Sequence, residues 1–241
     1  MTIRAVVFDA YGTLWDVLSV RDVATRLCGE TGDLVTQLWR LKQLEYSWLR
    51  ALMQDYADFW QVTRAALEFA LAAAGLAPEA RICEPLMERY RALDLYPDAG
   101  EALRRLDGCA CAILSNGTPG MLEALARRSG IAPLLARIIS VDAARTYKPD
   151  PRCYALVEPA LGVPKAEVLF VSANHWDVAG ARRFGFTAAW LARDPAPGAP
   201  AGGPADFYRL QRGRAERLGY EADLQIRTLA ELPEMIAARQ G

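Results

Sequence analysis

The segment VVFDAYGTLWD, residues 6–16, brings a carboxylate to the end of an apolar run. Asp9 directly follows AVVF, and a turn containing Gly12 and Thr13 comes next. A short, continuous apolar run predicts a strand that is buried on both faces. A carboxylate at the end of such a strand stays ionised only if cationic or hydrogen-bonding partners surround it. Asp9 is therefore the first residue for which the sequence indicates chemistry.

Polar residues follow three more apolar runs along the chain. In chain order they are Ser115, Asn116, Gly117 and Thr118, then Lys148 in YKPD, then Ser172, Asn174 and Asp177. In open α/β sheets, ligands bind outside the carboxyl ends of the strands. We therefore expect two carboxylates, one lysine and several hydroxyl and amide groups to meet at one edge of a sheet.

The apolar runs themselves predict the fold that positions these side chains. They cover residues 5–8, 111–114, 137–141 and 168–172, with weaker runs at 187–191 and 224–227. Helical patterns separate them, for example at 121–130 and 177–186. Alternating strands and helices indicate a doubly wound α/β fold, with a Rossmann-like parallel sheet and right-handed crossovers.

One long stretch, residues 17–96, interrupts this alternation. It shows no clear buried strand, and apolar residues recur there near a helical period at Leu34, Leu38, Leu41, Trp48 and Leu52. We expect these residues to pack between helices. Further helices are expected over 62–76 and up to Tyr90. The sequence thus predicts a helical cap, residues 17–96, inserted after the first strand of a core made of 1–16 and 97–241. The Pro, Gly and Ala run at 195–204 predicts a surface excursion.

Composition limits the classes of partner. The 241-residue chain is 52% hydrophobic and has a net charge of −1, so it can bury a sizeable core but offers no global field to attract nucleic acid or an anionic membrane. No segment approaches transmembrane length, and the N-terminus lacks a signal-peptide pattern. The odd number of cysteines, without a CxxC pair, favours reduced packing residues in a cytoplasmic protein. They are Cys28, Cys83, Cys109, Cys111 and Cys153.

Four segments resemble, in order, the four motifs of the haloacid dehalogenase superfamily. They are DAYGT, SNGT, YKPDPRCY and SANHWD. Over nearly its whole length the chain is similar to one branch, the L-2-haloacid dehalogenases. WRLKQLEYSWLR (39–50), FVSANHWDVAGA (170–181) and LAELP (229–233) carry this closer resemblance.

The resemblance implies hydrolysis of a carbon–halide bond. The expected reaction converts (S)-2-haloacids to (R)-2-hydroxyacids and halide, through a covalent ester on Asp9, with inversion at C2 and without metal or cofactor. The implied partners are a small 2-haloalkanoate and the halide ion, and the family suggests a homodimer. Departures from the family pattern at Leu41 and His175 put the substrate range in doubt.

Roles for the catalytic residues follow from the matched motifs. Asp9 is the expected nucleophile, and Lys148 keeps it ionised. Asp177 helps ready water for attack on the ester, although an Asp there could also cap the helix that follows. Ser172 and Asn174 order the same region. Arg40, which by itself would be read as a solvated helix arginine, accepts the halide in this context.

The remaining expected site residues bind the substrate. Ser115 and Asn116, with Thr13, bind the carboxylate or fix the nucleophile, and Tyr154 matches the family's site tyrosine. An apolar pocket, for which plain core packing is the alternative, consists of Tyr11, Leu44, Phe59 and Trp176. The only histidine, His175, is expected to be a satisfied loop residue and not a catalytic one.

Two alternative functions remain open. One is a magnesium-dependent phosphatase of the same superfamily. Phosphatases carry an Asp where this chain has Tyr11, and loss of such an acid can cost roughly 10²–10⁴ in rate. The fourth motif also lacks the paired acids that complete a magnesium site, whereas halide departs without needing a proton. The other alternative is a non-catalytic binder of small anions.

Overall fold

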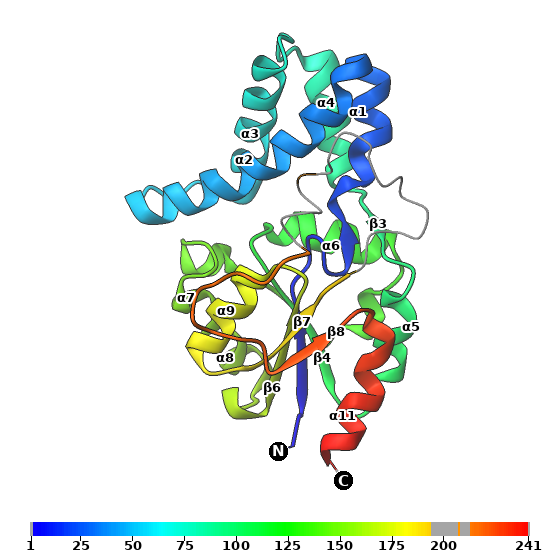
Figure 1. The fold of residues 1–241 in the computed structure, drawn as a ribbon, viewed down its shortest axis with the longest axis vertical. Helices are drawn as coiled ribbons and strands as arrows, with labels where there is room; N and C mark the ends of the chain where they lie inside the picture. The colour runs from blue at the N-terminus through cyan, green and yellow to red at the C-terminus, as the bar shows by residue number, and fades with distance from the viewer. Residues whose placement is uncertain (1, 194–206, 208–212, 241) are drawn as a thin grey trace.

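A computed structural model of the chain describes residues 2–193, 207 and 213–240 (Figure 1). Its centre is a six-stranded, all-parallel sheet with the order β5-β4-β1-β6-β7-β8. The strands are β1 (Ala5–Phe8), β4 (Ala110–Ser115), β5 (Arg137–Ser140), β6 (Val168–Ser172), β7 (Thr187–Leu191) and β8 (Leu224–Ile226). Each predicted run forms a strand, and the predicted α/β fold class is confirmed. The Pro, Gly and Ala run at 195–204 lies outside the described residues.

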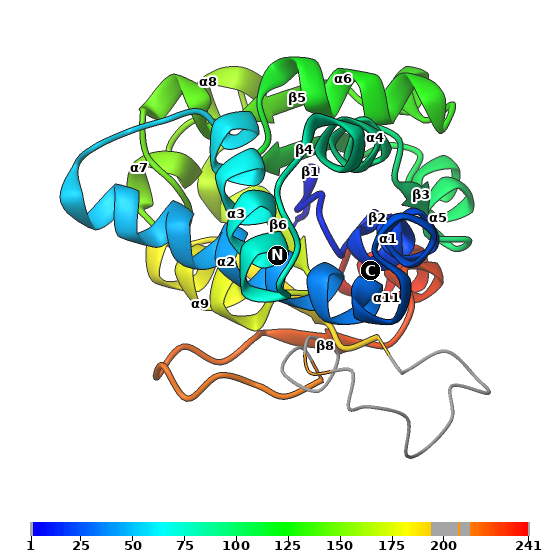
Figure 2. The ribbon, with the colours of Figure 1, turned by 90° about the horizontal axis from the view of Figure 1, so that it is seen from above.

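Helices cover both faces of this sheet. In Figures 1 and 2, α8 and α9 lie on one face, and α5 and α11 lie on the other. The core helices are α5 (Ala99–Arg105), α6 (Pro119–Arg128), α7 (Pro151–Tyr154), α8 (Val157–Leu161), α9 (His175–Phe184) and α11 (Leu232–Gln240). All four residues of β1 are fully buried, because β4 and β6 flank this strand and helices cover it above and below.

Two helices begin earlier than their apolar patterns indicate. α6 begins at Pro119 because the Thr118 hydroxyl accepts a hydrogen bond from the amide of Met121, which caps the helix. α9 begins at His175, with Asn174 at the N-cap position. The prediction that Asp177 could be the N-cap is therefore wrong. Asp177 lies inside the first turn, fully buried.

The helical region after β1 stands over the carboxyl ends of the strands (Figure 1). Its elements are β2 (Trp15–Asp16), α1 (Arg21–Cys28), α2 (Gly32–Met53), α3 (Phe59–Ala73), α4 (Ala80–Tyr90) and β3 (Asp94–Leu95). The sequence does not predict β2 and β3, two-residue strands that pair antiparallel where the chain enters and leaves this region. We refer to the helical region as the cap and to the remainder as the core.

The leucine pattern on α2 identifies the wrong face of that helix. Leu34 and Leu52 are 54% and 80% exposed, so the prediction that they pack between helices is wrong. The buried face instead carries a mixed set of side chains. Its members are Val35, Thr36, Gln37, Trp39, Arg40, Gln43, Leu44 and Ser47. Helical periodicity shows that an apolar face exists, but it cannot show that a second, partly polar face is the one covered by α3.

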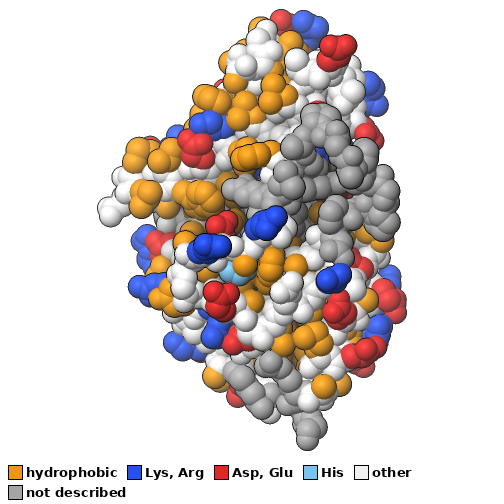
Figure 3. All heavy atoms as spheres, in the orientation of Figure 1, with side chains coloured by type: hydrophobic (Ala, Val, Ile, Leu, Met, Phe, Trp, Pro, Cys, Tyr) orange, Lys and Arg blue, Asp and Glu red, His pale blue; other side chains and the backbone are white. Residues whose placement is uncertain are grey.

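As a result, large hydrophobic side chains are exposed on the surface of the cap. Figure 3 shows hydrophobic side chains gathered over the cap. The exposed large hydrophobic residues of α2 and α3 are Leu34, Leu49, Leu52, Met53 and Phe69. In the described part of the chain, no helix has both the length and the hydrophobicity of a membrane-spanning segment. All five cysteines are free.

Candidate active site

Asp9 lies at the carboxyl end of β1 and is 6% exposed. Its backbone amide donates to the carbonyl of Val171, which fixes the residue beside β6. Four predicted site residues direct donors at its carboxylate. They are Lys148 Nζ, 3.0 Å from Oδ1, and Asn174 Nδ2, Thr13 Oγ1 and Ser172 Oγ, at 2.9, 3.2 and 3.5 Å from Oδ2. The sheet edge thus brings together donors from three separate loops.

Lys148 joins the two carboxylates of the site. Its Nζ donates to Asp9 at 3.0 Å and to Asp177 at 2.8 Å, and all three side chains are buried. Burial alone would lower the pKa of Lys148, but the charges of Asp177 and Asp9 raise it above its usual value. The ammonium therefore stays charged, and it compensates for part of the negative charge around it.

Asp177 occupies the most buried position of the three. Its Oδ1 accepts a hydrogen bond of 2.7 Å from the Tyr154 hydroxyl, and its Oδ2 faces Lys148. Burial raises the pKa of Asp177 to about 6, with Lys148 lowering it and Asp9 raising it. Burial, together with Asp177, raises the pKa of Tyr154 well above its usual value, so this phenol stays protonated and donates. Asp177 thus titrates close to neutral pH.

Three other predicted residues order the loops around the carboxylates. Asn116 Oδ1 accepts a hydrogen bond of 3.1 Å from the backbone amide of Lys148. Ser115 Oγ accepts one of 3.3 Å from the amide of Gly117. Thr13 Oγ1 accepts one of 2.9 Å from the amide of Ala173 and so ties the loop after β1 to the loop after β6.

Arg40 lies on the cap helix α2, and its charge acts on the pKa of Tyr11, which follows Asp9 by two residues. It is only 5% exposed, which excludes the alternative interpretation of Arg40 as a solvated helix arginine. Its Nη1 donates to Gln43 Oε1 at 2.6 Å. Gln43 is fully buried, accepts a second hydrogen bond of 2.9 Å from the Tyr90 hydroxyl, and donates to Thr63 Oγ1 at 2.6 Å. Residues from α2, α3 and α4 therefore hold the guanidinium together.

The sequence analysis did not identify Gln43, Thr63 or Tyr90. A signal existed for Gln43, because it follows Arg40 by three residues and therefore lies on the same helical face. Thr63 and Tyr90 belong to other helices, and no spacing in the sequence shows that these helices meet α2 at this point.

Tyr11 and Phe59, two residues of the predicted apolar pocket, lie in direct contact. The Tyr11 ring lies 5.5 Å from the rings of both Phe59 and Tyr90. Leu44 lies on the buried face of α2. Trp176 is half-buried and packs edge-on against the Trp48 ring at 5.3 Å, so its recorded aromatic neighbour belongs to the cap.

His175 has a structural setting. It is 4% exposed, its ring packs edge-on against Trp190 at 5.1 Å, and its Nδ1 accepts a hydrogen bond of 3.0 Å from the amide of Glu216. Burial lowers the pKa of His175, so the imidazole is neutral at pH 7. His175 is thus satisfied by its neighbours, but the prediction that it lies in a loop is wrong, because it is the first residue of α9.

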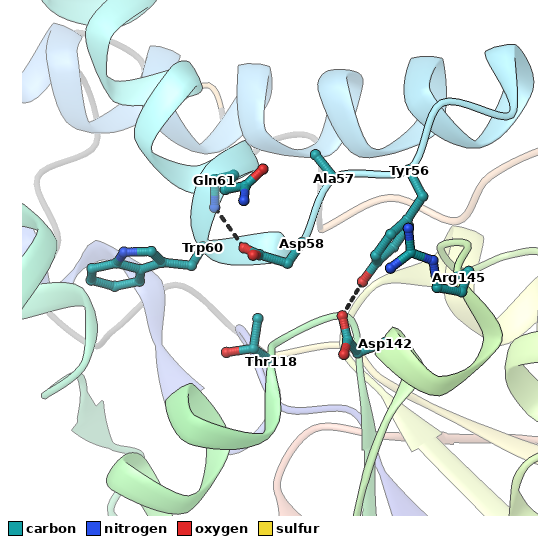
Figure 4. A pocket seen from close by; sticks show the side chains of 8 residues that line it. All are labelled: Tyr56, Ala57, Asp58, Trp60, Gln61, Thr118, Asp142 and Arg145. Carbon is teal, nitrogen blue, oxygen red and sulfur yellow. Dashed lines mark hydrogen bonds between the residues drawn. The ribbon is translucent and has the colours of Figure 1, made fainter.

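An open pocket of about 500 Å³ lies where the cap meets the core (Figure 4). Its lining residues are Tyr56, Ala57, Asp58, Trp60, Gln61, Thr118, Asp142 and Arg145. The Tyr56 hydroxyl donates to Asp142 Oδ1, and the Tyr147 hydroxyl donates to the carbonyl of Ala57 at 2.5 Å. Cap and core are therefore joined directly beside this opening, which the sequence analysis did not identify.

The donor set at the sheet edge does not suit Mg²⁺. This ion requires a near-octahedral shell of oxygens at about 2.0–2.1 Å. Among the residues that the structure describes, no group of three or more His, Cys, Asp and Glu side chains converges as a metal site. Asp9 and Asp177 are instead bridged by the ammonium of Lys148.

Comparison with known proteins agrees with this geometry. The family described as haloacid dehalogenase-like hydrolase matches residues 3–185. The (S)-2-haloacid dehalogenase of Xanthobacter autotrophicus is 47% identical, covering 99% of this chain and 97% of that protein. The (S)-2-haloacid dehalogenase 4A of Burkholderia cepacia is 45% identical, covering 81% and 86%.

Solved structures agree as well. The structure of L-2-haloacid dehalogenase from Xanthobacter autotrophicus superposes with a TM-score of 0.92 at 46% identity, covering 98% of this chain and 99% of that one. A second structure of that enzyme, with chloropropionic acid covalently bound, also gives 0.92, at 45% identity and the same coverage. The chain therefore belongs to the haloacid dehalogenase-like hydrolases, in the branch of the L-2-haloacid dehalogenases, which act on carbon–halide bonds.

Proposed function

We propose that this protein converts (S)-2-haloalkanoates to (R)-2-hydroxyacids and halide through a covalent ester on Asp9. The observation that carries the proposal is the Asp9 carboxylate, fixed at the end of a rigid strand by four donors within 3.5 Å. The relative with covalently bound chloropropionic acid supports an intermediate of this kind.

The first step is a displacement at C2. An Asp9 oxygen attacks C2 from the side opposite the halogen, the carbon–halogen bond breaks, and halide leaves with the bonding electron pair. Lys148 places its positive charge 3.0 Å from Oδ1 of Asp9 and so orients this carboxylate for the attack. Arg40, held in the buried cluster with Gln43, accepts the halide as its negative charge develops.

The second step hydrolyses the ester. Three neutral donors, from Thr13, Ser172 and Asn174, converge on Oδ2 of Asp9. We assign Oδ2 as the ester carbonyl oxygen, because these donors stabilise the negative charge that water attack places on it. Asp177, ionised above about pH 6, helps to activate the water.

The remaining predicted residues bind the substrate. The carbonyl oxygen of Asn116 is engaged by Lys148, so its NH₂ group and the Ser115 loop serve the substrate carboxylate. Tyr154 differs from these residues, because its hydroxyl donates to Asp177 and so orients that carboxylate. Tyr11, Leu44, Phe59 and Trp176 form the apolar wall around the alkyl group.

The stereochemical outcome tests this proposal. One displacement from the rear inverts C2, and ester hydrolysis at the Asp9 carbonyl leaves C2 untouched. (S)-2-chloropropionate should give (R)-lactate, measured by chiral chromatography, and the (R) substrate should react far more slowly. Retention at C2, or equal use of both enantiomers, contradicts the proposed geometry.

The reaction should need no metal. Activity is expected to survive exhaustive chelation, because charge compensation for the carboxylates comes from Lys148. A tenfold rise on adding Mg²⁺, with hydrolysis of phosphate esters, favours the phosphatase alternative. Tight binding of a haloacid without halide release favours the non-catalytic anion binder.

We further propose a cytoplasmic homodimer. The exposed apolar side chains of α2 and α3, named above, would be covered by a second copy of the chain. Sedimentation of the protein as a monomer at micromolar concentration contradicts the dimer.

A further inference from the structure

The Tyr11 hydroxyl is a buried donor whose partner is absent from the described protein atoms. Tyr11 is 2% exposed, and within the described residues its hydroxyl has no hydrogen-bond partner. A buried hydroxyl that lacks a partner lowers stability, and a phenylalanine has the same shape without this cost. The hydroxyl therefore requires an explanation other than packing.

The position of this hydroxyl places it in the catalytic region. Tyr11 follows the nucleophile by two residues, and its backbone carbonyl accepts a hydrogen bond of 3.2 Å from Asn174 Nδ2. A Cβ atom added to Gly117 would come within 2.7 Å of the Tyr11 hydroxyl. Glycine in the SNGT loop therefore makes room for the phenol, and the hydroxyl reaches the loop that follows β4.

The Tyr11 ring also adjoins the cluster that holds Arg40. Its ring lies 5.5 Å from the Tyr90 ring, and the Tyr90 hydroxyl and Arg40 Nη1 share the same acceptor, Gln43 Oε1. The halide acceptor and the Tyr11 phenol thus belong to one packed group of side chains.

Tyr11 acts as a donor throughout the working pH range. Burial raises the pKa of Tyr11 well above its usual value, Tyr90 and Asp9 raise it further, and the charge of Arg40 opposes them. The phenol keeps its proton, so it can give a hydrogen bond to an electronegative group but cannot protonate a leaving group.

We propose that the Tyr11 hydroxyl donates a hydrogen bond to the departing halogen, beside Arg40, and that it tunes the preference for one halogen over another. This inference rests on the proposed function. In the step concerned, Asp9 forms its bond to C2, the carbon–halogen bond breaks with its electrons on the halide, and the Tyr11 proton stays on oxygen. The residue that the sequence analysis placed in the apolar wall is thereby a polar contact of the leaving group.

The halogens differ in a way that makes the inference testable. Chloride accepts hydrogen bonds more strongly than bromide, and bromide more strongly than iodide, because the charge on the smaller ion is more concentrated. A donor that contacts the leaving group in the transition state contributes most to the release of chloride.

The test compares Tyr11→Phe with wild type on (S)-2-chloro-, bromo- and iodopropionate, measuring halide release in a single turnover. We expect the rate with the chloro substrate to fall on the order of tenfold or more, as for loss of one transition-state donor. The fall should be smaller for bromide and smallest for iodide, with KM little changed. The thermal midpoint should stay equal or rise, because an unsatisfied hydroxyl is removed.

Tyr147→Phe is the matched control. Tyr147 is equally buried, but its hydroxyl donates to the carbonyl of Ala57. This variant should lose thermal stability. The ratios between its single-turnover rates on the chloro, bromo and iodo substrates should equal those of wild type. Equal rate losses for all three halogens in Tyr11→Phe, or a rise in KM alone, overturn the assignment to the halogen. Absence of halide release from wild type overturns the proposed function itself.

Discussion

At the scale of single residues, the site depends on three buried charges. Lys148 lies between Asp9 and Asp177 and forms an ion pair with each carboxylate. Asp177, fully buried and with a pKa raised to about 6, is the member whose charge changes near neutral pH. The two chemical steps should therefore differ in their dependence on pH.

Hydrolysis of the ester should rise with pH through about 6. The proposed activation of water uses the ionised form of Asp177, and burial raises the pKa of this carboxyl from its usual 3.8 to about 6. Rapid-quench measurement of ester decay from pH 4.5 to 8 checks this, with Asp177→Asn expected to be slow at every pH. A decay rate that is flat across pH 6 contradicts the assigned role.

The same pKa has a consequence for stability with a defined sign. The folded state binds the Asp177 proton more tightly than the unfolded state. The protonated carboxyl therefore contributes to the free energy of unfolding, and this contribution is fully present below about pH 3.8. It is lost as pH rises through about 6.

Arg40→Lys should separate catalysis from folding. Lysine keeps the charge but loses the planar fork that meets Gln43. Turnover should fall by a factor on the order of 10²–10³. The free energy of unfolding should fall by about 1 kcal/mol, more than for a surface arginine. Arg81→Lys, on an exposed part of α4, is the control. It should change neither turnover nor the free energy of unfolding. Wild-type turnover in folded Arg40→Lys contradicts the role of the cap arginine.

At the scale of elements, α9 is the helix whose packing the site requires. A Cβ atom added to Gly180 would clash with the Tyr154 hydroxyl and lie 2.7 Å from Pro149 Cβ. Tyr154 holds Asp177, and Pro149 adjoins Lys148. The small residue within FVSANHWDVAGA therefore lets α9 approach the segment that carries the lysine.

Gly180→Ala should damage both stability and activity. Overpacking at this contact is expected to cost about 1–3 kcal/mol and to displace Tyr154. Gly120→Ala is the matched control, because Gly120 lies in α6 with no atom within 4 Å of an added Cβ. In the control, the free energy of unfolding should rise by about 0.5–1 kcal/mol, and activity should be unchanged. Denaturant titration and halide-release assays measure both effects, and a fully active Gly180→Ala contradicts the close packing.

How far the sequence predicts the site depends on which elements contribute to it. Asp9 and Asp177 could be predicted to meet, because parallel strands end at one edge of the sheet and both residues follow their strands within a few positions. Lys148 lies farther from the end of β5, and the resemblance of YKPDPRCY to the third family motif is what predicted its place. Of the residues that support Arg40, only Gln43 could be predicted, because it lies three residues along the same helix. Thr63 and Tyr90 come from two other helices, and the packing of these helices against α2 leaves no local pattern. The prediction that the leucines of α2 are buried was wrong for a related reason. Periodicity shows that a helix has an apolar face, but not which element covers that face.

At the scale of the whole molecule, cap and core share one hydrophobic cluster. It extends from β1 through Tyr11 to Phe59 and Tyr90 in the cap. Hydrogen bonds from Tyr56 to Asp142 and from Tyr147 to Ala57 join the two regions at the open pocket. The cap thus rests on the nucleophile loop as part of the same packed interior.

We therefore expect one cooperative unfolding transition. A shared interior exposes its apolar surface in a single step, so tryptophan fluorescence and far-ultraviolet circular dichroism should give the same midpoint. Two separated midpoints, with the cap melting first, contradict a common core.

The central claim, that Asp9 forms a covalent ester hydrolysed at its own carbonyl, is tested most directly by isotope transfer. One turnover of (S)-2-chloropropionate by excess protein in H₂¹⁸O should place ¹⁸O in the Asp9 carboxylate, detected by mass spectrometry of the peptide that contains it. The first lactate released should carry unlabelled oxygen from Asp9. Label in that lactate with none in Asp9 would show that water attacks C2 directly, and would contradict the account.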